Sequence, residues 1–467
     1  MAARFAAKTG GMVPAVSETP QTFMKKSIIF SLLLLGGLAT AGITARAQDS
    51  GALLDLMVRK GLITDAEAEQ VRSDLTKDFV ANTPAGKLNL SSNLTELRIS
   101  GDLRMRFETR SGQVPSGDNS ERDRFRYRLR AGLSGRLAND WSWGFRVEGS
   151  DGSRSSNVTM GDENAGPFTK TKDAVYIGQV WARWNPNSAF NLTVGRMPNP
   201  LTTTSMVWDG DINPEGIAEQ FNVRRGQLEY SATLAQFVYN PANTQNFFGT
   251  SSSMKDQLLL AWQGGLKYYI DGSSRFLQVS PTLYTYVRGN ATSGTAGSVF
   301  NGNFTTAKQT GINDLQVVEI PMEYAWQAKG VPMRLFGDAA VNLQSSDRAR
   351  KFGRPDLDGE KYAWNVGIQY GKAAAKGTWD AKLFYQSTGA FALDPNLVDS
   401  DLFDSRTNMK GVVFSANYAL GTATQLTFTA ARAQRVNDSI AALGSGDIAT
   451  GLFDRYTLLQ VDLNLKF

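Results

Sequence analysis

The sequence contains no cysteine and no histidine among its 467 residues. Without cysteine the fold has no disulfide, so apolar burial and backbone pairing must hold it together. Without histidine, serine–histidine catalysis, histidine-ligated metal sites and a histidine pH switch are all excluded. Beyond residue 47 no segment has about 18 consecutive apolar residues, so no transmembrane helix is expected there.

A net charge is also nearly absent once the first 47 residues are set aside. The whole chain has 49 basic and 44 acidic residues, and five of the basic and one of the acidic residues lie in 1–47. The remaining 44 basic and 43 acidic residues leave a net charge of +1. The pI near 9.1 therefore does not indicate a nucleic-acid partner.

The beginning of the chain has the pattern of a secretory signal peptide. Residues 24–47 read MKKSIIFSLLLLGGLATAGITARA, with two lysines, an apolar core and Ala45-Arg46-Ala47 as a cleavage site. Met24 is the expected start and Gln48 the first mature residue, which makes 1–23 an over-extended start. A retained membrane anchor is the alternative interpretation.

Residues 48–86 are predicted to form a short helical hairpin followed by a polar linker. Thr64 and Glu67 have the spacing of a capping box, and apolar residues then recur at helical spacing. This periplasmic segment is interpreted as a packing or oligomer contact, with a ligand site as the alternative.

Residues 90–467 alternate between apolar and polar side chains, which is typical of β-strands with one apolar and one wet face. In RFRYRLRAGLSGRL, from Arg124 to Leu137, an arginine occupies every second position of the first half. Arginines at this spacing do not pack into a dry core without partners, but they can line water.

We predict sixteen strands joined alternately by seven short turns and eight long loops of about 12 to 27 residues. This layout indicates an all-β fold, a transmembrane antiparallel β-barrel of the outer-membrane type, with short periplasmic turns and long external loops. A soluble β-sandwich is the alternative that a single alternating segment leaves open. The predicted strands are 97–108, 124–137, 141–150, 174–184, 190–196, 217–224, 226–239, 257–269, 275–287, 315–327, 331–343, 361–371, 378–388, 409–419, 424–433 and 455–467.

Aromatic residues gather near the short turns, where amphipathic rings would form a girdle at the periplasmic interface. The last stretch, RYTLLQVDLNLKF, alternates strictly and ends at Phe467. It resembles the insertion signal that the barrel assembly machinery reads, and a closed barrel must pair this strand with its first. The aromatic residues are Trp141, Trp143, Trp184, Phe190, Tyr268, Tyr269, Trp326, Tyr370, Trp379 and Tyr418.

The stretch VGRMPNPLTTTSMVWDGDINPEG, 194–216, contains the third external loop, and by analogy with general porins, in which this loop folds into the barrel, it is expected to narrow the pore. Its prolines make it stiff. Asp209, Asp211 and Asn213 begin a calcium-loop pattern, but Pro214 replaces the required glycine and Gln220 the bidentate glutamate, so turn-forming Asx residues are the preferred interpretation and no metal or other cofactor is expected. The constriction residues are Met197, Pro198, Asn199, Pro200, Trp208, Asp209, Asp211, Asn213 and Glu215.

Three stretches carry a family resemblance: LLDLMVRKGLITDAEAEQVRSDL, GRMPNP followed by WDGDINPEG, and the barrel ending. They resemble the putative porin family of Gram-negative outer membranes, which is similar in architecture to the phosphate- and pyrophosphate-selective porins. The resemblance implies a 16-stranded channel in the cell outer membrane, a homotrimer with a periplasmic N-terminal segment. Phosphate-selective members use lumen arginines and lysines, and the arginines of residues 124–130 match that idea in residue type.

The leading functional prediction is a passive porin channel for small hydrophilic solutes, with an anion preference from an arginine-lined lumen. If these arginines pair instead with acids of neighbouring strands or of the folded-in loop, the preference is small. A sugar channel with Trp181 and Phe384 as lumen aromatics, an adhesin or structural barrel, and an enzyme are the alternatives; an enzyme is disfavoured because the barrel enzymes considered use histidine. The predicted pore-lining residues are Arg98, Arg104, Arg106, Arg124, Arg126, Arg128, Arg130 and Arg146.

Overall fold

The computed structural model describes residues 54, 57–60, 63–64, 67–71, 73–74, 93–114, 116–117, 119–150, 155–161, 174–240, 256–272, 274–287, 315–444, 446–448, 451–452 and 454–467. The chain divides into two compact units, Met1–Leu90 and Ser91–Phe467. The predicted start, signal peptide and linker around residues 82–86 lie outside the described residues.

The described part of the first unit is helical at residue 54 and over residues 57–59, 67–71 and 73–74. The predicted capping box is present, because the Thr64 backbone N–H donates to Glu67 Oε2 at 2.8 Å and the Glu67 N–H donates to Thr64 Oγ1 at 3.2 Å. The hydrogen bond from the Thr64 backbone lowers the pKa of Glu67 below its usual value. Among the described residues, no helix is both long and apolar enough to cross a membrane.

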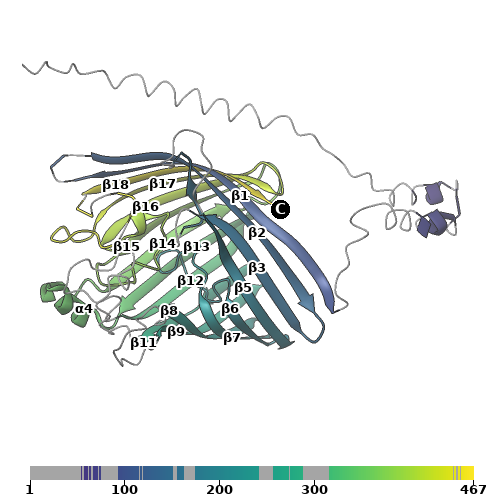
Figure 1. Cartoon of the computed structure of the whole chain (residues 1–467), viewed down its shortest axis with the longest axis horizontal. Helices are drawn as coiled ribbons and strands as arrows, with labels where there is room; N and C mark the ends of the chain where they lie inside the picture. Colours follow the sequence, from purple (N-terminus) through teal and green to yellow (C-terminus); the bar gives the residue numbers. More distant parts are fainter. Residues whose placement is uncertain are drawn as a thin grey trace, which may run out of the picture. The chain divides into compact units, whose positions relative to one another are not determined.

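The second unit is a closed antiparallel β-barrel (Figure 1). Strands β10 and β11 occupy one position between β9 and β12, and the two-residue β4 pairs with β2 beyond the end of β3. The described residues therefore form a barrel with sixteen strand positions. The strands are β1 (Leu94–Gln113), β2 (Asn119–Leu137), β3 (Trp141–Ser150), β4 (Val158–Thr159), β5 (Ala174–Asn187), β6 (Phe190–Arg196), β7 (Glu215–Arg225), β8 (Leu228–Asn240), β9 (Gln257–Asp271), β10 (Arg275–Val279), β11 (Thr282–Val287), β12 (Gln316–Ala328), β13 (Val331–Asn342), β14 (Tyr362–Gly371), β15 (Trp379–Thr388), β16 (Met409–Ala419), β17 (Thr424–Arg435) and β18 (Arg455–Lys466).

Two features differ from the sequence prediction. The predicted single strand 275–287 is interrupted at Ser280 and Pro281, since proline has no N–H to donate to the ladder. The first predicted long loop is wrong: β1 and β2 continue to pair as far as Gln113 opposite Asn119, so only residues 114–118 separate them.

Short and long connections alternate around the barrel as predicted, apart from this first loop. The turn between β12 and β13 consists of Lys329 and Gly330, both with positive φ, at 51° and 78°. Such two-residue turns match the right-handed twist of paired strands. The long-loop end carries α4 (Ser345–Phe352), while the C-terminus lies at the opposite end of the barrel (Figure 1).

The barrel closes by pairing β1 with β18, as predicted from the last stretch of the sequence. Leu103 lies opposite Leu465 and Arg106 opposite Asp462, so apolar residues meet on one face and charged residues on the other. At the end of the seam, the N–H groups of Gly101 and Phe467 donate to each other's carbonyl oxygens at 2.8 and 3.1 Å.

The outer face of the barrel is apolar, and most of the predicted girdle aromatics lie on it. Trp141, Trp184 and Trp379 are exposed beside the short turns, together with Tyr268, Tyr370 and Tyr418. Tyr269 differs, since its ring is buried and its hydroxyl donates to Glu229 at 2.6 Å. Tyr269 follows Tyr268 directly in a strand, so the two side chains point to opposite faces.

Candidate functional site

Strands β1 and β2 carry a series of arginines on the inner face of the barrel. Phe107 and Phe125 pair on the outer face, and Phe125 is half exposed. The arginines that alternate with these outward residues along the two strands are mostly buried. The register sets Arg104 opposite Arg128 and Arg106 opposite Arg126. Like charges directly opposite each other destabilise a sheet unless carboxylates compensate them. We call these residues the arginine ladder: Arg104, Arg106, Arg110, Arg124, Arg126, Arg128 and Arg130.

Glu108 compensates the upper part of the ladder from within β1. Its oxygens accept hydrogen bonds from Arg124 Nε at 2.7 Å and Arg110 Nη2 at 3.0 Å. Gln460 of β18 adds a third hydrogen bond at 2.8 Å. Glu108 is completely buried, so these partners replace the water that its charge would otherwise need.

Two loop carboxylates also reach the upper ladder. Asp447, in the loop between β17 and β18, pairs with Arg124 and with Arg110, the latter at 3.3 Å. Asp404, in the loop between β15 and β16, pairs with Arg110 at 3.3 Å. Burial acts to raise the pKa of Asp447, but the charges of Arg110 and Arg124 outweigh it and hold that pKa below its usual value.

The middle of the ladder pairs with β18 and with the loop between β15 and β16. Arg106 donates from Nε to Asp462 and from Nη1 to Asp401, each at 2.7 Å. Arg104 lies 3.8 Å from Asp401 and hydrogen-bonds Asn157. Burial opposes the ionised form of Asp401, but the adjacent charges of Arg106 and Arg104 dominate and lower its pKa.

The lower ladder pairs with β1 and with the third long loop. Arg128 and Arg130 donate from Nε to Asp102 at 3.0 and 2.6 Å, and both approach Asp211 at 3.3 and 3.4 Å. Arg126 donates to the Asn157 carbonyl at 3.1 Å and lies 4.0 Å from Glu108. Every ladder arginine therefore has a carboxylate oxygen within 4.0 Å.

The structure does not bring all the predicted pore-lining arginines together. Arg98 lies at the short-turn end, where its exposed side chain pairs with Glu96 at 3.0 Å. Arg146 lies on β3 and pairs with Glu148 at 3.1 Å. Arg110 belongs to the ladder but was not predicted, because the predicted first strand ends at residue 108.

The third long loop, residues 197–214, folds against the inner wall of the barrel. Met197, Met206 and Trp208 are buried in an apolar cluster with Phe237 of β8 and Leu259 of β9. The Thr202 N–H donates to Gln263 Oε1 at 2.9 Å, and Gln220 Nε2 donates to the Pro200 carbonyl at 3.0 Å. These contacts fix the loop inside the barrel.

Two adjacent threonines of this loop bind buried carboxylates of the wall. Thr203 Oγ1 donates to Glu319 Oε1 of β12 at 2.7 Å, and Thr204 Oγ1 donates to Asp338 of β13. Glu319 also accepts a hydrogen bond from the buried Tyr284 hydroxyl at 2.6 Å. The loop hydroxyls thus satisfy acceptors that would otherwise be buried without partners.

The aspartates of the third long loop form turns and contact a second loop. Asp209 Oδ1 accepts from the Asp211 N–H at 2.9 Å, and Asp209 Oδ2 accepts from the Ser400 N–H at 2.9 Å. Burial and then the charge of Asp211 raise the pKa of Asp209. Among the described residues, no group of three or more acidic side chains is arranged to hold a metal ion.

The remaining constriction residues are divided between the loop and the outer face. Asn199 Oδ1 accepts from the Leu201 N–H at 3.0 Å, next to Pro198 and Pro200, and Asn213 accepts from Gln179 of β5 at 2.9 Å. Glu215 instead begins β7 and pairs with Arg196, in line with the outward Ile217 and Val194. Glu215 therefore lies apart from the loop that it was expected to join.

A cavity of about 320 Å³ lies beside residues 202–205 of the third long loop and is lined by β10 and by β12 to β15. Arg334 of β13 and Lys382 of β15 line it beside Glu323. These two cations were not among the predicted pore-lining residues, although their parity in the strands could have identified them. Phe384 lines the same cavity, whereas Trp181 packs over Gly144 on β3, so the two aromatics proposed for a sugar track lie on separate walls.

One family of known proteins matches part of the barrel. The family model described as Putative porin matches residues 107–313, which include most of the ladder and the whole third long loop. Over these residues the chain matches a porin family. Porins are outer-membrane channels, and the family and the barrel are those of a channel rather than an enzyme.

Solved porins are similar in structure at low identity. The anion-selective porin from Comamonas acidovorans is 10% identical, with a TM-score of 0.45, over 80% of this chain and 99% of its own. OprB from Pseudomonas putida is 11% identical, with a TM-score of 0.46, over 79% of this chain and 94% of its own. A search of curated proteins finds no match.

Proposed function

We propose that this porin is a passive channel for small hydrophilic solutes whose ion-paired wall gives at most a weak anion preference. The observation that carries this proposal is the pairing of every ladder arginine with a carboxylate within 4.0 Å. Arginine stays charged in proteins, so neutralisation has to come from its partners. Charges of both signs along the wall orient water and small polar solutes while their long-range fields largely cancel.

The test is the zero-current potential across a planar bilayer under a KCl gradient. The wild type should conduct, and its zero-current potential should be close to that of a weakly anion-selective pore. This selectivity should decrease as the salt concentration rises. Arg126→Gln with Arg128→Gln should shift the potential toward cations, because Asp102 and Asp211 keep their charge and lose a partner. Absence of conductance would reject the channel and favour an adhesin, and strong selectivity in the wild type would reject the balanced wall.

The proposed setting is the outer membrane of a Gram-negative bacterium, reached with a signal peptide, residues 24–47, and with a periplasmic helical segment, residues 48–86. A homotrimer is the expected assembly, by resemblance to the family. The apolar outer face supports contact with outer-membrane lipid. The exposed ring of Phe467 supports its proposed role as the signal for the assembly machinery, which Phe467→Asp tests by loss of membrane assembly with secretion retained.

A further inference from the structure

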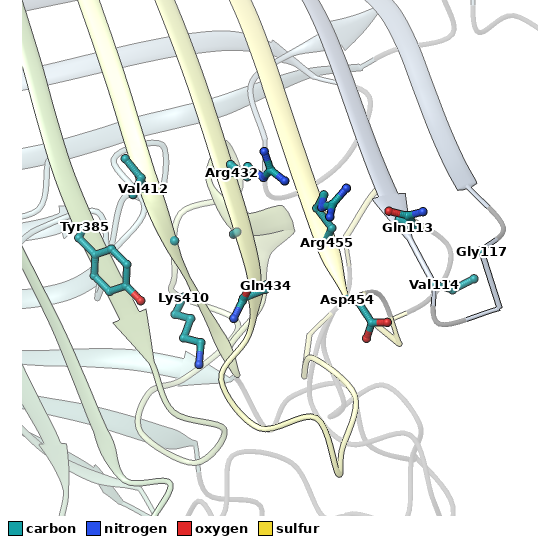
Figure 2. A pocket seen from close by; sticks show the side chains of 12 residues that line it. Gln113, Val114, Gly117, Tyr385, Lys410, Val412, Arg432, Gln434, Asp454 and Arg455 are labelled. Carbon is teal, nitrogen blue, oxygen red and sulfur yellow. The ribbon is translucent and has the colours of Figure 1, made fainter.

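A pocket of about 660 Å³ lies on the outer face of the barrel, at the long-loop ends of β15 to β18 and β1 (Figure 2). Lys410, Arg432 and Arg455 contribute cationic side chains, and Gln113 and Gln434 contribute amides. The pocket is on the outer face because these residues share strand parity with exposed apolar residues. These are Val412 on β16, Phe428 on β17 and Phe467, which follows β18.

The three cations of this pocket have no carboxylate within salt-bridge distance among the residues that the structure describes. Asp454, the carboxylate that lines the pocket, is bound to Arg435 at 2.7 Å, and its N–H donates to the Gln113 carbonyl. This differs from the inner face, where every ladder arginine is paired. An unpaired cationic cluster attracts a mobile anion.

The position of the cluster along the strands points to a membrane interface. On β16 the outward residues run from Phe414 through Val412 to Lys410, and on β17 from Phe428 to Arg432 and Gln434. The apolar series therefore gives way to cations on both strands within one outward-facing position, since Arg432 lies opposite Val412 and Lys410 opposite Gln434. A cation on the lipid face costs about 2–4 kcal/mol at the membrane centre and about 0–1 kcal/mol near the interface.

We propose that this pocket binds the phosphorylated headgroup of a lipid in the outer leaflet. The guanidinium groups of Arg432 and Arg455 match phosphate oxygens in geometry and charge. Gln113, Gln434 and the Tyr385 side chain offer hydrogen bonds to headgroup hydroxyls, and Val412 begins the apolar surface on which acyl chains lie. The acidic residues Glu121 and Asp123 share the outer face but lie on β2, beyond β1.

The proposal rests on the outer-membrane placement of the channel, with the long loops outside, and it does not depend on the ion selectivity of the lumen. The probe is lipid A with two phosphates, titrated into the full-length protein in detergent, and native mass spectrometry measures the bound fraction. Lipid A without phosphates tests whether the acyl chains suffice, and inorganic phosphate tests whether the site takes a free anion.

Arg432→Gln with Arg455→Gln should weaken binding of the diphosphorylated lipid by roughly 10- to 30-fold, at about fivefold for each cation. The matched control is Lys372→Gln with Lys376→Gln, which removes two exposed cations from a short turn at the opposite end and should leave binding unchanged. Both variants should conduct like the wild type. If the wild type itself does not conduct, that result counts against the channel and not against this site.

Equal binding by wild type and Arg variant, equal binding of the dephosphorylated lipid, or saturation by inorganic phosphate alone would each overturn the proposal. A change of oligomer mass in the Arg variant, with lipid binding preserved, would assign this face to a second copy of the chain and would also overturn it.

Discussion

Asp401 lies near three ladder arginines at once, at 3.8 Å from Arg104, 2.7 Å from Arg106 and 3.9 Å from Arg110. The same charges lower its pKa and keep it ionised across the physiological range. A single loop carboxylate therefore neutralises charge that three arginines of β1 supply. At the scale of one residue, selectivity is set by the partners of the arginines as much as by the arginines.

We expect Asp401→Asn to make the channel more anion-selective. The substitution keeps the shape of the side chain but leaves Arg104 and Arg106 with less compensation, so the anion-to-cation permeability ratio should rise by about 2- to 5-fold at low salt. The zero-current potential under a KCl gradient measures this ratio. Asp356→Asn, which changes an exposed aspartate of the loop before β14, is the control and should have no effect. An unchanged ratio in Asp401→Asn would show that solutes do not pass within range of these arginines.

A second residue-scale prediction concerns pH. Burial, with the charges of Asp209 and Asp401, raises the pKa of Asp399 well above its ordinary value, and the Asp399 N–H binds Ser205 of the third long loop. A carboxyl whose pKa is raised by folding binds its proton more tightly in the folded state, so stability falls as pH rises from about 3.9 through the raised pKa. Asp401 does not oppose this trend there, because its lowered pKa places its effect at more acidic pH.

The heat-unfolding temperature of the wild type should therefore decrease with rising pH across this window. Asp399→Asn carries no proton to lose and should show a flatter profile. Asp356→Asn is again the control and should keep the wild-type slope, and identical slopes in all three proteins would contradict the assignment to Asp399.

At the scale of elements, hydrogen bonds from Thr203 and Thr204 hold the third long loop against the barrel wall, and we call these two hydrogen bonds the latch. Thr203 and Thr204 satisfy Glu319 and Asp338, and each lost hydrogen bond to such a buried group costs about 1–3 kcal/mol. Thr203→Val with Thr204→Val should weaken docking of the loop while keeping the shape of both side chains. Single-channel recordings should then show a larger and noisier conductance than in the wild type.

Thr202→Val is the matched control for the latch, because the Gln263 side chain binds the backbone of Thr202. This control should conduct like the wild type. A double variant with unchanged conductance and noise would mean that the apolar contacts of Met206 and Trp208 hold the loop without the latch.

Alternation in the sequence was sufficient to predict the sixteen strand positions, their order and the inward direction of the arginines within residues 124–130. The face of a strand residue follows from its parity. It could not predict the continued pairing of β1 and β2, where Arg110 faces Arg122 and Asp447 from a distant loop pairs with both. For the same reason it could not decide between free and paired arginines. The partners Asp401, Asp404 and Asp447 lie in loops, whose folding into the barrel has no periodic signal.

At the scale of the whole barrel, the seam between β1 and β18 depends on a residue without a side chain. A Cβ at Gly101 would lie 2.4 Å from the Arg130 carbonyl and 2.5 Å from the Phe467 ring. Gly101→Val should therefore displace the ring and strain the seam by about 1–3 kcal/mol, reducing the fraction that migrates as a compact barrel on an unheated gel. Gly149→Val, an outward glycine with nothing near its Cβ position, should assemble normally, and equal yields of both variants would contradict this role of Gly101.

The pairing of the ladder also has a consequence for the order in which the barrel is built. Arg106 and Asp462 are separated by 356 residues, and Arg124 and Asp447 by 323. Contacts between such distant residues form late, because the chain entropy of bringing them together must be lost first. Until then the hairpin of β1 and β2 is strongly cationic, and its arginine side chains remain hydrated. The ion-pair network therefore couples the two steps: the arginines of β1 and β2 lose their hydration only when β18 and the loop before it arrive.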